Sequence, residues 1–110
     1  MSDKEIIEAA RRFAGTIMAS GTYKEYLLQR EKIKKQPDLY DQVNEFRRRN
    51  FDLQNEADGD ELFDRVEAFE MEYEKFRENP FVDDFLRAEL AFCRLMQEVY
   101  VLLAEEIDFE

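Results

Sequence analysis

The chain has 110 residues, a net charge of −11, no histidine and one cysteine. Apolar residues make up 45% and charged residues 39%, a balance that excludes both a disordered tail and a membrane protein. Three glycines and two prolines are too few for many short strands and turns. The composition therefore predicts one all-α domain over residues 1–110, a bundle of about five helices with charged outer faces.

The first two helices are predicted over residues 3–19 and 23–35. Ile6, Phe13 and Ile17 recur at helical spacing in the first, and a Ser-Gly-Thr triplet interrupts the pattern. Thr22 is followed three residues later by Glu25, which is the spacing of a capping box. We therefore expect Thr22 to cap the second helix.

The third and fourth helices are predicted over residues 38–54 and 61–78. Pro37 marks the start of the third, because proline suits a first helical turn and the residue before it avoids the α region. Residues 55–60 contain turn-forming side chains around Gly59 and predict a loop.

The fifth helix is predicted over residues 80–107, with Asn79 as its cap and Pro80 in its first turn. At 1.5 Å per residue it would be about 42 Å long. It is apolar on two sides, so it needs two sets of neighbours, and a second subunit is the natural source of one. We expect a homo-oligomer, dimeric or tetrameric, with an interface formed by Phe81, Phe85, Phe92, Leu95, Val99 and Leu102.

The charge is unevenly distributed along the chain. Residues 24–49 hold eight basic and five acidic side chains, whereas residues 50–110 hold five basic and nineteen acidic ones. Nucleic-acid binding relies on a cationic footprint, so no direct nucleic-acid ligand is expected. The basic stretch is solvated helix surface by default, with a docking patch for an acidic protein surface as the second interpretation and an RNA contact as the third. The patch would consist of Lys34, Lys35, Arg47, Arg48 and Arg49.

Catalytic and ligand-binding chemistry is not indicated. Without histidine the chain lacks the commonest general base and the usual nitrogen ligand, so we expect no catalytic residue, no cofactor and no metal site. Cys93 lies in an apolar seam and is predicted to be core. Glu89 interrupts that seam. It either lies at an exposed edge of the helix, or it pairs with a basic residue and so fixes the register of an oligomer.

The location expected from the sequence is cytoplasmic. A single cysteine excludes an intrachain disulfide and suits a reducing compartment. The longest wholly apolar run, residues 99–104, is far shorter than the ~20 residues that span a bilayer, so no membrane insertion is expected. The N-terminal residues show no secretory pattern.

The sequence resembles the YlbF/YmcA/YheA family of small bacterial helical proteins in the order and spacing of the motifs at these helix boundaries. The matching pieces are residues 20–23 (SGTY) with Tyr26, residues 36–39 (QPDL), residues 46–47 (FR), residues 79–82 (NPFV), residues 88–89 (AE) and Phe92.

The resemblance implies a non-enzymatic regulator that forms homo- or hetero-oligomers. Family members act in competence, sporulation and biofilm formation, in a complex with a membrane-anchored ribonuclease that affects messenger RNA maturation. Some carry a cysteine-bearing tail linked to iron–sulfur clusters. This chain has only Cys93, so it cannot ligate a cluster alone. Two alternatives remain open: a structural homo-oligomer without a dedicated partner, and a helical protein that binds metal through clustered carboxylates.

Overall fold

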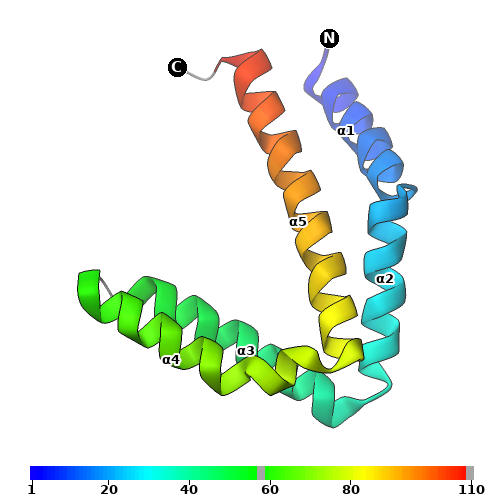
Figure 1. Cartoon of the computed structure of the whole chain (residues 1–110). Coiled ribbons are helices and arrows are strands. Elements are labelled where there is room, and N and C mark those ends of the chain that lie inside the picture. Colours follow the sequence, from blue (N-terminus) through cyan, green and yellow to red (C-terminus); the bar gives the residue numbers. More distant parts are fainter. Residues whose placement is uncertain (57–58, 109–110) are drawn as a thin grey trace.

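The computed structural model describes residues 1–56 and 59–108, which form five helices and no strand (Figure 1). The predicted all-α fold is therefore confirmed. The helices, in chain order, are α1 (Asp3–Met18), α2 (Gly21–Lys34), α3 (Pro37–Glu56), α4 (Gly59–Glu78) and α5 (Pro80–Ile107).

The start of α2 differs from the prediction. Ser20, not Thr22, is its N-cap: the Tyr23 amide donates a hydrogen bond of 3.1 Å to the Ser20 hydroxyl. The capping box predicted for Thr22 is wrong because the hydroxyl two residues earlier already satisfies a first-turn amide. At the start of α5 the prediction is confirmed, since the Asn79 side chain accepts a hydrogen bond from the Phe81 amide at 2.9 Å and Pro80 occupies the first turn.

The loop predicted over residues 55–60 is shorter than expected. Helix α3 continues to Glu56, and α4 begins at Gly59, whose φ of 54° suits a residue without a side chain. Two features accompany the longer α3: Leu53 in its last turns is buried, and the side-chain amide of Asn55 donates a hydrogen bond to the Phe51 carbonyl at 2.8 Å. Residues 57 and 58 of the predicted loop lie outside the described part of the chain.

The helices form a V with two arms (Figure 1). One arm is α5 packed along α2, with α1 extending onward from the start of α2, and the other is the hairpin of α3 and α4. The radius of gyration is 18.1 Å, against about 13 Å for a compact chain of about 100 residues. Much of the helix surface therefore faces open space between or beside the arms.

The fully buried core lies at the junction of the arms. Its members are Ile33 of α2, Val43 of α3, and Val82 and Phe85 of α5. Phe85 is 1% exposed, and its ring stacks on Tyr26 with 6.0 Å between centroids. It is unavailable to a second subunit, which corrects its predicted place in an interface.

An aromatic layer holds the α3–α4 hairpin together. The Phe46 ring of α3 lies 5.3 Å from Phe69, 5.1 Å from Tyr73 and 5.9 Å from Phe76, all of α4, measured between centroids. Such pairs contribute about 0.5–1.5 kcal/mol each beyond their buried area. The hairpin is thus held by its own contacts, and only its base joins the other arm.

Candidate protein-interaction surfaces

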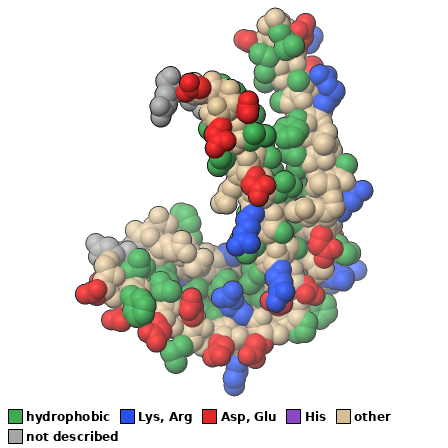
Figure 2. Space-filling model, turned by 45° about the horizontal axis from the view of Figure 1, so that its top comes forward, with side chains coloured by type: hydrophobic (Ala, Val, Ile, Leu, Met, Phe, Trp, Pro, Cys, Tyr) green, Lys and Arg blue, Asp and Glu red, His purple; other side chains and the backbone are tan. Residues whose placement is uncertain are grey.

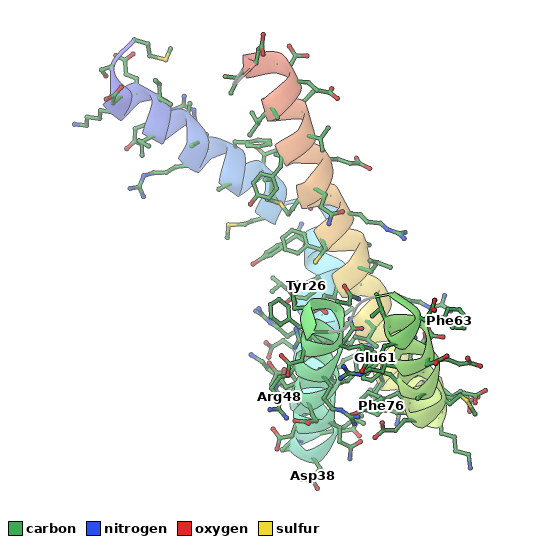
Figure 3. The ribbon with its side chains drawn as sticks, turned by 90° about the vertical axis from the view of Figure 1, so that its left-hand side faces the viewer. Tyr26, Asp38, Arg48, Glu61, Phe63 and Phe76 are labelled. Carbon is green, nitrogen blue, oxygen red and sulfur yellow. The ribbon has the colours of Figure 1, made fainter. Side chains whose placement is uncertain are left out.

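The predicted docking patch does not form a single cluster of cations. Arg47, Arg48 and Arg49 are consecutive on α3, so their side chains leave the helix about 100° apart. Each contacts a carboxylate of its own chain, at 2.6 Å, 2.6 Å and 2.7 Å respectively. Figure 3 shows Arg48 on the outer side of α3. Successive basic residues in the sequence therefore do not make one basic surface here.

Two of these ion pairs stabilise the hairpin locally. Arg49 donates to Glu72 and to the Tyr73 hydroxyl of α4, and its hydrogen bond lowers the pKa of Glu72 while raising its own. Arg48 donates to Glu45 one turn earlier on α3, which raises the pKa of Arg48. Both pairs are solvent-exposed, so each contributes little to stability.

The two lysines of the predicted patch lie at the end of α2, away from Arg48. The Lys34 ammonium lies 5.9 Å from the centroid of the Tyr40 ring, and Lys35 is exposed. Neither lysine makes an ion pair within the described residues, so they retain cationic surface at the apex of the V.

Glu89 joins the two arms of the V. Its carboxylate accepts a hydrogen bond of 2.6 Å from Arg47, 42 residues earlier in the sequence. Burial raises the pKa of Glu89, and the nearby Arg47 charge opposes this without cancelling it. Glu89 does pair with a basic residue, but within its own chain, so the contact matches neither the exposed edge nor the oligomer register of the two sequence interpretations. Only the fold brings these two residues together.

The predicted α5 interface divides into a closed part and an open part. The Phe92 ring packs on Tyr23 and Tyr26 of α2, at 5.1 and 5.4 Å between centroids. Leu95 and Val99 are half-buried. Phe81 at one end and Leu102 at the other are about half exposed. Helix α2 thus covers the middle of the seam, and the end nearest the C-terminus remains open.

A second uncovered apolar surface lies on α1, at the same end of the arm as the open part of α5. Helix α1 has no buried residue, although its apolar side chains recur at helical spacing. Figure 3 shows α1 running away from the far end of α5, although both helices extend to the same end of the arm. We call this region the arm tip; its exposed large apolar residues are Ile6, Ile7, Phe13, Met18, Tyr100, Val101, Leu102, Leu103 and Ile107.

A hollow of about 370 Å³ lies between the arms, and we call it the notch. Figure 2 shows the open space between the arms, with hydrophobic side chains on both. The apolar residues lining the notch are Phe46, Val66 and Phe69 of the hairpin and Leu86, Leu90 and Cys93 of α5. Cys93 is exposed, which corrects its prediction as a core residue. Its seam is apolar, but no helix of the same chain covers it at this position.

Chemical groups suited to metal binding do not converge in the part of the chain that the structure describes: no cluster of three or more Asp, Glu or Cys side chains is found there. Over the same residues, none of the helices has the length and apolar character needed to cross a bilayer. What the described surface does offer is uncovered apolar area at the arm tip and in the notch.

Comparison with known proteins shows relatives that match along almost the whole chain. A UPF0342 protein of Symbiobacterium thermophilum is 30% identical over 103 residues, covering 92% of each chain. A UPF0342 protein of Caldicellulosiruptor bescii is 23% identical over 109 residues, covering 97% of this chain and 92% of the relative. No solved structure gives a significant match. The family described as "Control of competence regulator ComK, YlbF/YmcA" matches residues 6–108, and the chain therefore belongs to the YlbF/YmcA family.

Proposed function

We propose that this protein is a non-enzymatic regulatory module that self-associates through the arm tip and, once assembled, docks onto other proteins. The family description, control of a competence regulator, supports the regulatory role. Self-association is supported by the uncovered apolar surface of α1 and of the far end of α5.

The apolar area exposed on α1 and the far end of α5 is large enough to favour association with a second molecule. The arm-tip residues each expose about half of their surface, which sums to on the order of 800 Å² of apolar area, divided between α1 and the far end of α5. The largest apolar patch on a typical monomer is about 300–600 Å². A second copy brings an identical uncovered surface, and two such patches can cover each other.

Docking to a further protein follows from the family resemblance. The resemblance implies a partnership with a ribonuclease in messenger RNA maturation, and we extend that kind of partnership to this chain. The parts of the V outside the arm tip, including the cationic apex at Lys34 and Lys35, remain available for such a partner.

The experiment is a measurement of solution mass by light scattering coupled to size exclusion. We expect the wild type to run at a multiple of its 13.3 kDa chain mass. Tyr100→Glu places a charge in the apolar surface of the arm tip and should shift the mass towards the monomer while circular dichroism remains helical. Met71→Glu is the control, because Met71 is equally exposed but lies on α4, and it should leave the mass unchanged. A wild type that is strictly monomeric refutes the proposed self-association.

Docking is tested separately. Tagged wild-type protein, purified from cells and cross-linked before lysis, should retain a protein involved in regulation or RNA processing. Retention of nothing but further copies of the chain contradicts docking and favours the structural homo-oligomer.

A further inference from the structure

Charge is divided unequally between the helices. Residues 21–35, which comprise α2 and its C-terminal cap, carry five basic and two acidic side chains, whereas α4 carries three basic and eight acidic ones. None of those five basic side chains makes an ion pair within the described residues; they are Lys24, Arg30, Lys32, Lys34 and Lys35. The chain has 27 acidic and 16 basic residues. Positive charge thus persists on α2 although carboxylates are in excess.

Two of these cations lie on tyrosine rings. The guanidinium carbon of Arg30 lies 5.5 Å from the centroid of the Tyr26 ring, and the Lys34 ammonium lies 5.9 Å from that of Tyr40. Arg30 and Lys34 are four residues apart, so they share one side of α2, with their Cβ atoms about 5–6 Å apart. We call these four residues the cation ledge. Both rings pack against the buried core at the junction of the arms, so the ledge has a fixed base.

Arg30 has no counter-ion of its own. It is half-buried, and its Nε–H is fully buried without a hydrogen-bond acceptor. An unpaired charge in such a place is unfavourable, and an anionic acceptor from another molecule offsets that cost. Asp38 and Asp41 flank Tyr40 in the sequence of α3, but neither forms an ion pair with the ledge. The ledge therefore retains its hydrogen-bond donors for a ligand.

We propose that the cation ledge binds an acidic helical segment of another protein, through two carboxylates at positions i and i+4 of that segment. The proposal rests on the docking proposed above and names its contact. Arg30 takes one carboxylate with its planar fork of donors, and Lys34 takes the other as a point charge. The two spacings match, because both pairs lie one turn apart on a helix. The fixed base lowers the cost of ordering the two cations.

A protein segment fits the ledge better than a nucleic acid does. Nucleic-acid affinity depends on the neutralisation of many phosphates, and the ledge offers two cations. An extended polyanion would also be repelled by the acidic surface of helices such as α4. Leu27 lies on the same side of α2 as Arg30, three residues before it, and is half-buried. It provides an apolar contact for the side-chain stems of an acidic helix.

A titration followed by fluorescence anisotropy tests the chemistry of the ligand. The probes are two labelled, alanine-rich helical peptides that differ only in one pair of residues at i and i+4, which is glutamate in one and glutamine in the other. The wild type should bind the glutamate peptide roughly tenfold more tightly, and added salt should reduce this advantage. Equal binding of the two peptides overturns the proposal.

Variants test the place of binding. Lys34→Gln and Arg30→Gln should each weaken binding of the glutamate peptide roughly threefold to tenfold. Lys75→Gln is the matched control, because Lys75 is an exposed lysine of α4 without an ion pair within the described residues. It makes the same change in net charge and should leave binding nearly unchanged. An equal loss in Lys34→Gln and Lys75→Gln would mean that only net charge matters, and it overturns the site. Lys34 is exposed, so its variant should fold even where Arg30→Gln does not.

Two other occupants would give different results. A single-stranded RNA oligonucleotide that binds more tightly than the glutamate peptide, and loses this affinity in Lys34→Gln, overturns the proposal in favour of nucleic acid. The double variant Arg30→Gln/Lys34→Gln should keep the wild-type solution mass in light scattering. A fall to the monomer would make the ledge a contact between subunits and would also overturn the proposal.

Cross-linking in cells separates this proposal from the docking on which it rests. The double variant Arg30→Gln/Lys34→Gln should lose the protein that the wild type captures, whereas Lys75→Gln should retain it. If the double variant captures the same protein as efficiently as the wild type, docking stands and the ledge is not its site. If the wild type captures no other protein, both proposals are overturned.

Discussion

Replacing Phe85 by alanine removes the largest fully buried side chain at the junction of the two arms. Phe85 is 1% exposed and contacts two other helices: its ring stacks on Tyr26 of α2, and the Arg47 guanidinium of α3 lies 5.4 Å from its centroid. Deleting a buried phenylalanine side chain costs about 3–5 kcal/mol. The ring contacts with Tyr26 and Arg47 place this position in the upper half of that range.

The loss is large compared with the stability of the protein. Small domains have a free energy of unfolding of about 5–15 kcal/mol. Because so few side chains are fully buried at the junction, we expect a value in the lower part of that range. Urea denaturation followed by far-UV circular dichroism measures the change. Wild type and variant should be compared at one protein concentration, because self-association adds to the apparent stability.

The control is Met71→Ala, which removes a large apolar side chain that is 70% exposed on α4. It should change the free energy of unfolding by no more than about 0.5 kcal/mol. If Phe85→Ala costs no more than Met71→Ala, the junction is not the core of the molecule and the assignment of Phe85 to the protomer's interior is wrong.

Further predictions concern a helix cap and two ion pairs. Ser20→Ala should lower the free energy of unfolding by about 1 kcal/mol in the same denaturation assay, whereas Thr22→Ala should change it little. If Thr22→Ala were the more destabilising change, Thr22 would be the cap, as the sequence predicted. Burial raises the pKa of Glu89 in the folded state, so its contribution to stability is greatest below the unfolded-state pKa and is lost as the pH rises through the folded-state pKa. The thermal midpoint of the wild type should therefore rise relative to that of Glu89→Gln between about pH 7 and about pH 4, and a fall would mean that the Arg47 contact outweighs burial. Arg48→Ala, which removes an exposed pair with Glu45, should leave the thermal midpoint almost unchanged.

The sequence predicted the helices well because their signals are local. Apolar spacing within a helix and the Asn79-Pro80 start of α5 need no information from elsewhere in the chain. The errors concern helix ends, where packing elsewhere in the fold decides between local alternatives. Ser20 and Thr22 are both acceptable caps two residues apart, and the choice depends on which turn packs well. The end of α3 depends on Leu53, whose burial against the fold extends the helix beyond the predicted loop.

The candidate sites were harder to predict because they depend on contacts across the chain. The arginines at 47–49 look like one patch in the sequence, but the fold supplies a separate carboxylate to each. The partner of Glu89 lies 42 residues away. Phe85 and Leu102 share one seam of the same helix, yet α2 covers the first and leaves the second open.

By itself, the sequence determined the helical class, the number of helices, the two-sided apolar character of α5 and the family resemblance. Helix formation and amphipathicity are set by residues three and four positions apart, which is why they can be read along the chain. Only the tertiary structure decided which side of α5 is covered within the protomer and which stays exposed. That choice depends on where α2 and the α3–α4 hairpin lie, and the packing at the junction of Ile33, Val43, Val82 and Phe85 places them there.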